Sequence, residues 1–176
     1  MSASRKPRRT RKSIRWPGWN YSQAGFYFVT ICTHQRQHFF EIGHIRESVE
    51  NSWEQIPQYT SGQFVELDEY VVMPNHMHGI LVMKPGFSET RTAETRATLL
   101  GNTIGTFKSL VTKRVRILLK IGDVPLPIWQ RGYYDRVIRN EREYHAIQQY
   151  IRDNPKRWAE DRDNLDQLIT KMTKKS

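Results

Sequence analysis

Two apolar runs flank a proline and an asparagine in the stretch Val71-Val72-Met73-Pro74-Asn75-His76-Met77-His78-Gly79-Ile80-Leu81-Val82. Proline and asparagine both favour tight turns, so the stretch predicts two connected strands, from about residue 63 to 73 and from 76 to about 83. The second strand has apolar neighbours on both faces. This is typical of a central strand in a sheet.

The same stretch carries two histidines one residue apart, His76 and His78. Alternate side chains of a strand point to the same face, so both imidazoles would project together and could bind one metal ion. Histidines at a strand end can also be satisfied by water or by the backbone. The pair alone does not decide between these interpretations.

Periodicity and turn residues outside this stretch predict the rest of the fold. The predicted elements are a strand over 26–33, a helix over about 46–59 that Pro57 cuts short, a helix over about 100–120, a strand over 128–138, and a helix that Asn140 caps and that runs as far as Asn154, before Pro155. This order predicts an α+β fold of the ferredoxin-like (RRM-like) kind, with one antiparallel sheet and the helices packed on one face.

The length of 176 residues fits one domain with appendages. We expect a basic, disordered arm over 1–15, a domain over 16–158 with a mobile loop over 84–98, and a polar tail over 159–176. A single cysteine, Cys32, excludes an internal disulfide and is expected as a buried thiol, which fits a reducing cytoplasm.

The net charge of +10 points to a polyanionic partner. Nucleic acid is favoured over a membrane surface, because no apolar run approaches the roughly 20 residues of a spanning helix. The basic N-terminus is not followed by an apolar segment, so it does not predict a secretory signal. We therefore expect a cytoplasmic protein.

Two groups of basic residues are candidates for contacts with DNA phosphates. In the N-terminal arm they are Arg5, Lys6, Arg8, Arg9, Arg11, Lys12 and Arg15, with no acidic residue among them. On the helix over 100–120 they are Lys108, Lys113 and Arg114, with Arg116 and Lys120 nearby. A solubilising tail and a solvated helix face are the ordinary alternatives for these two groups.

Tyr150 and Asn154 lie four residues apart and therefore share one face of the last helix. On a helical wheel Tyr144 belongs to the apolar stripe, whereas Tyr150 lies at its flank, where its hydroxyl can be accessible. Taken singly, Tyr150 is an ordinary boundary residue and Asn154 an ordinary helix end.

Together with the two histidines, these residues form a specific constellation. Two imidazoles and the amide oxygen of Asn154 give three ligands of mixed nitrogen and oxygen type, which suit Mg²⁺ or Mn²⁺. Such an ion polarises a phosphodiester, and the hydroxyl of Tyr150 is then a nucleophile that forms a phosphotyrosine link. Because the pKa of a free tyrosine is near 10, the hydroxyl needs the metal or a base to lose its proton.

These motifs resemble those of a known family. Pro74-Asn75-His76-Met77-His78 is similar to the HUH signature of single-tyrosine nucleases, in which U is a hydrophobic residue. The runs Trp129-Gln130-Arg131-Gly132-Tyr133-Tyr134-Asp135 and Tyr150-Ile151-Arg152-Asp153-Asn154-Pro155 resemble the REP-associated tyrosine transposases, relatives of small insertion-sequence transposases. The resemblance covers roughly residues 12–158. It implies His76 and His78 as metal ligands, Asn154 as the third ligand and Tyr150 as the nucleophile.

The resemblance also implies an activity, namely metal-dependent cleavage and rejoining of single-stranded DNA. Tyr150 would keep the 5′-phosphate as a covalent adduct and release a 3′-OH that can reverse the reaction. Relatives recognise imperfect hairpins, which for this family are repetitive extragenic palindromes (REPs). The arm over 5–15 would contact the hairpin, with Trp16, Trp19 or Tyr21 stacking on unpaired bases or packing in the protein. The family resemblance leaves a monomer or a homodimer open.

Two residues depart from the family pattern. Many relatives carry histidine where this chain has Arg136. Asn154 precedes Pro155, and a residue before proline is disfavoured in helical geometry, so the helix is expected to end there.

Two other classes of function are compatible with parts of the pattern. A nucleic-acid-binding module of RRM-like topology would bind without catalysis, but it gives no reason for the histidine pair with a downstream tyrosine. A rolling-circle replication initiator or relaxase also uses tyrosine chemistry. Relaxases place the tyrosine before the histidines, and initiators with two tyrosines would need Tyr144, beside Gln148, as the second.

Overall fold

The computed structural model describes residues 24–58, 64–85, 99–122 and 124–161. Its main elements are β1 (Gly25–Cys32), α1 (Gly43–Glu54), β2 (Val65–Met73), β3 (His76–Met83), α2 (Leu99–Leu119), β4 (Tyr134–Ile138) and α3 (Glu141–Asp161). Short 3₁₀ helices η1 (His34–Arg36), η2 (Phe39–Glu41) and η3 (Ile56–Gln58) lie around α1. The predicted N-terminal arm, the loop beyond Pro85 and residues 162–176 lie outside the described residues.

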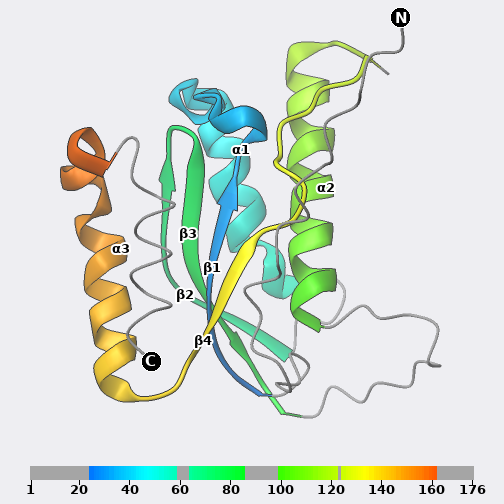
Figure 1. The fold of residues 1–176 in the computed structure, drawn as a ribbon. Coiled ribbons are helices and arrows are strands. Elements are labelled where there is room, and N and C mark those ends of the chain that lie inside the picture. Colours follow the sequence, from blue (N-terminus) through cyan, green and yellow to red (C-terminus); the bar gives the residue numbers. More distant parts are fainter. Residues whose placement is uncertain (1–23, 59–63, 86–98, 123, 162–176) are drawn as a thin grey trace, which may run out of the picture.

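The strands form one antiparallel sheet in the order β2-β3-β1-β4 (Figure 1). The predicted α+β class with a ferredoxin-like antiparallel sheet is therefore confirmed. As predicted, β3 is central, and it lies between β2 and β1. Its register places His76 opposite Cys32 and His78 opposite Thr30 on β1.

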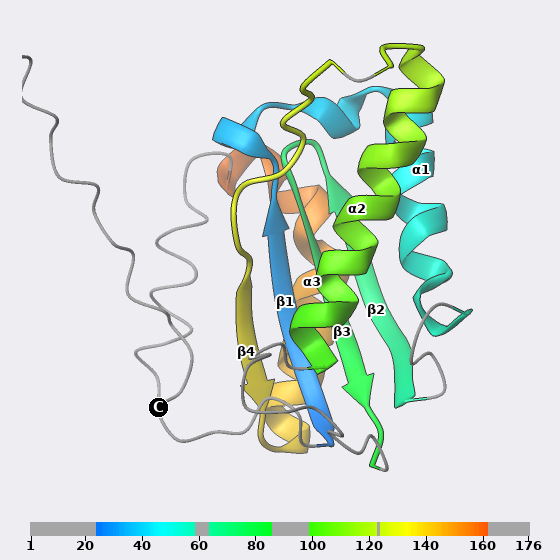
Figure 2. The ribbon, with the colours of Figure 1, turned by 90° about the vertical axis from the view of Figure 1, so that its right-hand side faces the viewer.

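The helices cover both faces of the sheet, so the prediction that they pack on one face is wrong for α3. Figures 1 and 2 show α1 and α2 on one side of the sheet and α3 on the other. Tyr27, Val29 and Ile31 of β1 belong to the core under α1 and α2, whereas Phe28 packs with Ile147 and Ile151 of α3. The central strands carry apolar side chains on both faces of the sheet. Helices must therefore pack on both faces to shield these side chains from water.

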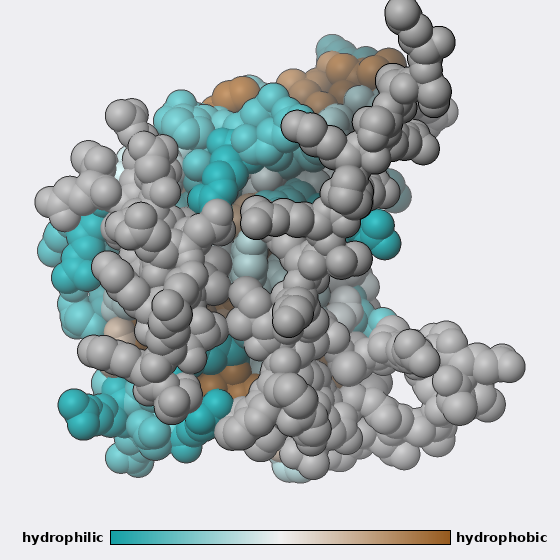
Figure 3. All heavy atoms as spheres, viewed as in Figure 1, coloured by the Kyte–Doolittle hydropathy of each residue, from teal (hydrophilic) through white to brown (hydrophobic). Residues whose placement is uncertain are grey.

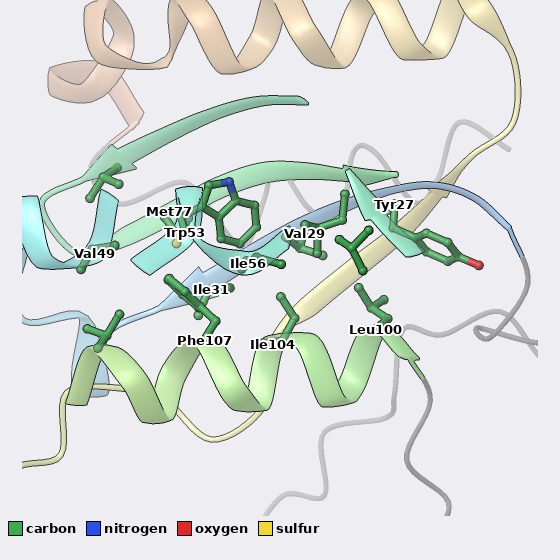
Figure 4. Close-up of a cluster of buried hydrophobic side chains, with 14 of the residues drawn as sticks. Tyr27, Val29, Ile31, Val49, Trp53, Ile56, Met77, Leu100, Ile104 and Phe107 are labelled. Atoms are coloured by element: carbon green, nitrogen blue, oxygen red, sulfur yellow. The ribbon is translucent and has the colours of Figure 1, made fainter. Parts of the chain in front are cut away.

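The larger core lies between the sheet and helices α1 and α2 (Figure 4). Trp53 of α1 is fully buried there and rests on Gly79 of β3. A Cβ atom at position 79 would lie 2.4 Å from Cζ2 of Trp53, so only glycine fits beneath the indole. Cys32 is a buried thiol, as predicted.

The outer surfaces of the helices differ in character. The exposed side of α3 is hydrophilic, in keeping with its place as an outer layer (Figure 3). The C-terminal end of α2 exposes Ile117, Leu118 and Leu119, and hydrophobic colour gathers at that end of the molecule in Figure 3. No helix within the described ranges is long and apolar enough to cross a membrane.

Three element boundaries differ from the predictions. Helix α1 begins and ends earlier than 46–59, at Gly43 and Glu54, and Pro57 lies in η3. Strand β4 begins at Tyr134 instead of residue 128, because Gly132 takes a φ of 82° and Trp129 makes only an isolated bridge to Thr33. The third difference, in α3, bears directly on the site.

Helix α3 continues through Pro155 to Asp161, so the predicted end at Asn154 is wrong. Its start is as predicted, because Oδ1 of Asn140 accepts a hydrogen bond from the backbone N–H of Glu143 at 2.8 Å. Pro155 is exposed, and Ile151 and Asn154 beside it are buried against the sheet. Packing of this face outweighs the hydrogen bond that proline removes.

Candidate active site

The two histidines lie side by side on the face of β3 that α3 covers. Both side chains are buried, His78 almost completely, and their rings meet edge to face with centroids 4.7 Å apart. Nε2 of His76 lies 3.1 Å from Nε2 of His78. The predicted projection of both imidazoles from one face is confirmed.

A partner from another residue fixes the orientation of each ring. Nδ1 of His76 lies 2.7 Å from Oδ1 of Asn75, and Nδ1 of His78 lies 2.8 Å from Oγ1 of Thr30 on β1. When each Nδ1 carries the proton and donates it to its partner, each Nε2 presents a lone pair. Such outward hydrogen bonds are the usual support of histidines that bind metals.

Tyr150 approaches this pair from α3. Its hydroxyl lies 3.2 Å from Nε2 of His78, and the two rings meet edge to face with centroids 5.3 Å apart. Phe28 of β1 stacks on His78 and also meets Tyr150, at an interplanar angle of 82°. The tyrosine is half-buried, so its hydroxyl is held at the histidines while part of the side chain remains accessible.

Asn154 lies one helical turn after Tyr150 and is buried, with 2% of its surface exposed. One further turn along α3, Trp158 meets the ring of His76, with centroids 5.7 Å apart. Asn154 therefore lies between a residue that contacts His78 and a residue that contacts His76. Its Nδ2 is buried without a hydrogen-bond partner among the described residues.

The pKa values of both histidines favour the neutral form. Burial, together with the positive charge of Arg36, lowers the pKa of His76 to about 3. Burial, together with His76, lowers the pKa of His78 well below its ordinary value. Both imidazoles are therefore neutral at pH 7, which is the state that binds a metal ion.

The donors present fit a small divalent cation. Two ligands at about 2.1 Å from an ion, placed at right angles, lie about 3.0 Å apart, and the two Nε2 atoms lie 3.1 Å apart. A flip of the Asn154 amide would place its oxygen where the unpaired Nδ2 now lies. Among the described residues no three His, Cys, Asp or Glu side chains gather to hold a metal, so the candidate site depends on this amide.

Tyr144, the other tyrosine of α3 that sequence reasoning considered, lies elsewhere. Its hydroxyl donates to Oδ2 of Asp68 on β2, and this bond with burial raises the pKa of Tyr144 to about 12. Arg136, the position where the family resemblance implies a histidine, forms an ion pair with Glu143. Both residues thus have partners other than the histidine pair.

Helix α2, which carries predicted DNA-binding residues, lies on the opposite side of the sheet from α3, the helix that contacts His76 and His78 (Figure 2). Lys108 donates to the backbone carbonyls of Gln130 and Gly132, and Arg114 donates to Ser52 and Gln55. Lys113 is exposed and lines an open groove of about 630 Å³ together with Lys108, Arg116 and Trp129. The roles of these residues in DNA binding stay predictions.

Other predicted contacts fall on residues that the structure does not describe. They are Arg5, Lys6, Arg8, Arg9, Arg11, Lys12, Arg15, Trp16, Trp19 and Tyr21. Within the site, sequence reasoning missed Phe28, Thr30 and Trp158. Thr30 could have been suspected, because it is the polar residue in an apolar strand, but nothing in the sequence pairs it with His78.

Comparisons with known proteins place the chain in a family. A protein of Haemophilus influenzae (strain ATCC 51907 / DSM 11121 / KW20 / Rd), described only as uncharacterized, is 35% identical over 170 residues, covering 86% of this chain and 91% of the relative. The chain belongs to the same family as this protein. No model of a protein family matches the sequence.

Two solved structures are distantly similar. A REP-associated tyrosine transposase bound to a REP hairpin has a TM-score of 0.48 and 19% identity, over 88% of this chain and 73% of that one. A proposed transposase of Deinococcus radiodurans R1 has a TM-score of 0.47 and 18% identity, over 79% of this chain and 97% of that one.

Proposed function

We propose that this protein is a metal-dependent endonuclease and transesterase of single-stranded DNA, with Tyr150 as the nucleophile. One observation carries the proposal: α3 brings the hydroxyl of Tyr150 to 3.2 Å from Nε2 of His78, which itself lies 3.1 Å from Nε2 of His76. Residues more than 70 positions apart in the sequence thus meet in a buried site. A hydroxyl within hydrogen-bond reach of an imidazole is an arrangement that can activate a nucleophile for attack on phosphorus.

The residues have distinct proposed roles. His76, His78 and Asn154 would hold Mg²⁺ or Mn²⁺, which when bound polarises the phosphate and favours loss of the tyrosine proton. The oxygen of Tyr150 attacks phosphorus and the bond from phosphorus to the 3′ oxygen breaks. The 3′ oxygen takes up the proton that Tyr150 gives up, and the 5′-phosphate stays esterified to the tyrosine. Attack by the 3′-OH reverses these steps and rejoins the strand.

The proposed substrate is single-stranded DNA that carries a hairpin, such as a REP-type palindrome. The net charge of +10 suits a polyanion. The three sequence motifs resemble those of a family that recognises hairpins, and this resemblance is the reason for proposing a hairpin substrate. Cleavage and rejoining of this kind would allow transposition or recombination of DNA in the cytoplasm. The basic residues 5–15 are the proposed contacts to the hairpin.

The structure weighs against the two other classes of function. An RRM-like module presents an open sheet face to nucleic acid, whereas β1 and β3 are here covered by α1 and α2 on one face and by α3 on the other. An initiator with two tyrosines would need Tyr144 at the site, but its hydroxyl is bonded to Asp68. Neither alternative is favoured by a specific observation.

The test is a search for the covalent adduct. The purified protein is incubated with a labelled hairpin that has single-stranded flanks, in the presence of Mg²⁺ or Mn²⁺, and then separated under denaturing conditions. We expect a protein-DNA adduct that Tyr150→Phe abolishes. The matched control is Tyr70→Phe, which removes a tyrosine hydroxyl that donates to Glu54 of α1, and it should still form the adduct. An adduct that persists in Tyr150→Phe would overturn the proposal.

A further inference from the structure

The candidate site is divided between two elements that are not neighbours in the chain. The histidines lie on β3, whereas Tyr150 and Asn154 lie on α3, so the site exists only while α3 keeps its position. The apolar contact that holds α3 is small, and its buried members are Phe28, Ile80, Ile138, Ile147 and Ile151. Val71, Tyr144 and Tyr150 are partly buried against this cluster.

A row of polar contacts along one flank of α3 adds to this cluster. Tyr144, Gln148 and Arg152 are spaced by four residues and thus form one stripe. The hydroxyl of Tyr144 donates to Asp68, and Nε2 of Gln148 donates to the two carboxylate oxygens of Asp68 at 3.2 and 3.3 Å. Arg152 donates to Oε1 of Glu69 at 3.0 and 2.6 Å.

A bulge in β2 brings both carboxylates to the helix. Leu67 pairs with Leu81 and Tyr70 pairs with Gly79. Two residues of β2, Asp68 and Glu69, therefore lie opposite a single residue of β3, Ile80. In a regular strand Asp68 and Glu69 would point to opposite faces. The extra residue breaks this alternation, and both side chains reach α3.

The geometry of the helix relates this flank to the site. Successive residues of an α-helix are rotated by a little more than a quarter of a turn, so residues at a spacing of four drift slowly around the helix to one side. The stripe of Tyr144, Gln148 and Arg152 therefore drifts away from Tyr150, and the buried Ile147 and Ile151 lie between the stripe and Tyr150. When α3 rotates about its own axis, the stripe moves away from the sheet as Tyr150 moves toward it, or the reverse.

We propose that the bulge residues Asp68 and Glu69 are positioning residues, which fix the rotation of α3 and so hold the hydroxyl of Tyr150 at Nε2 of His78. The catalytic consequence rests on the proposed function. Asp68 makes the larger contribution, because its bonds are part-buried whereas the pair of Glu69 with Arg152 is exposed and weak. Neither residue contacts the reacting atoms.

A small rotation is sufficient to matter. A group about 6 Å from the helix axis moves by about 1 Å when the helix turns by about 10°. A displacement of about 1 Å at a reacting group can slow a reaction by about 100-fold. Loss of the Asp68 contacts is therefore expected to act on the rate and not on the binding of DNA.

The test compares Asp68→Ala with Glu66→Ala. Glu66 lies on the same strand but pairs with Lys84 and not with α3, which makes it a matched control. Two quantities are measured on folded protein: the rate of adduct formation at saturating hairpin, and the ¹⁵N resonance of His78 Nε2 without metal or DNA. The melting temperature and the dissociation constant of the hairpin are recorded alongside.

We expect Asp68→Ala to slow adduct formation about 10- to 100-fold with an unchanged hairpin dissociation constant. The His78 resonance should shift in the direction that Tyr150→Phe shifts it, and Glu66→Ala should change neither quantity. A rate within twofold of Glu66→Ala, or an unmoved His78 resonance, overturns the proposal. If Asp68→Ala is unfolded at the assay temperature, Tyr144→Phe replaces it, because it keeps the ring against Phe26 and removes only the hydroxyl.

The two readouts separate this inference from the proposed function. If the wild-type protein forms no adduct on any hairpin, the proposed function fails, and the His78 resonance alone decides whether Asp68 positions Tyr150. If the adduct forms normally in both Asp68→Ala and Glu66→Ala and is lost in Tyr150→Phe, the positioning role fails while the proposed function stands.

Discussion

The hydroxyl of Tyr150 lies 3.2 Å from Nε2 of His78, the nitrogen that also faces Nε2 of His76. This nitrogen has one lone pair when Nδ1 donates to Thr30. The lone pair can accept the tyrosine hydroxyl or bind a cation, but not both. A bound metal would therefore take the place of this one hydrogen bond, while α3 keeps Tyr150 next to the histidine pair.

This competition predicts that Tyr150→Phe binds Mn²⁺ more tightly than the wild-type protein. Metal binding no longer has to displace a hydrogen bond worth about 1 kcal/mol, so the affinity should rise about fivefold. Isothermal titration of the DNA-free protein measures the change. A weaker affinity in the variant would mean that the hydroxyl is itself a ligand.

The amide of Asn154 is predicted to be the third metal ligand. Asn154→Ala should lower the Mn²⁺ affinity by about tenfold or more, and Asn154→Asp should restore it, because a carboxylate is a stronger ligand for this ion. Nδ2 of the amide has no hydrogen-bond partner among the described residues, so its removal breaks no bond of this nitrogen, and circular dichroism checks that the variant is folded. Equal affinities in the three proteins would show that Asn154 is no ligand.

The lowered pKa values of the histidines predict a dependence of stability on pH. In the unfolded chain these imidazoles take up protons below about pH 6.5, whereas in the folded chain they stay neutral down to lower pH. The unfolded state then binds more protons, so the free energy of unfolding falls as the pH falls below about 6.5. Urea denaturation of metal-free protein at pH 7, 6 and 5 measures this slope.

The matched variant for this measurement is His78→Leu, which has no proton to bind. Its free energy of unfolding should fall less steeply between pH 7 and pH 5 than that of the wild-type protein, by up to about 1.4 kcal/mol per pH unit. Identical slopes would contradict the burial of a neutral His78.

The contact of Trp53 with Gly79 predicts a large loss of stability in Gly79→Ala. The new methyl would lie 2.4 Å from the indole, and overpacking of this kind costs about 1 to 3 kcal/mol. The control is Gly105→Ala on α2, where nothing lies within 4 Å and alanine should stabilise the helix by about 0.5 to 1 kcal/mol. Equal melting temperatures for the two variants would argue against this packing of α1 on β3.

Local patterns in the sequence were sufficient for much of the fold and the site. The stretch over 71–82 predicted β2, the turn and β3, because period-two alternation and turn residues are local signals. The spacing of Tyr150 and Asn154 placed them on one helix face for the same reason. That this face meets His76 and His78 came from the family resemblance and not from the pattern.

The remaining features depend on contacts between distant segments. The placement of α3 on the second sheet face, and its passage through Pro155, follow from burial of Ile151 and Asn154 against the sheet. The bulge that aims Asp68 and Glu69 at α3 depends on the register of β2 with β3. The packing of α3 on the sheet and the register of β2 with β3 both depend on residues far apart in the sequence, so local patterns do not predict them.

The central claim is that Tyr150 becomes covalently joined to DNA, and peptide mapping tests it most directly. The adduct formed with a hairpin substrate is digested with a protease and a nuclease, and the modified peptide is identified by mass spectrometry. We expect a nucleotide joined through its 5′-phosphate to the peptide that contains Tyr150. A modification on Tyr144 or on any other residue, or no modified peptide from a substrate that the protein cuts, would contradict the account.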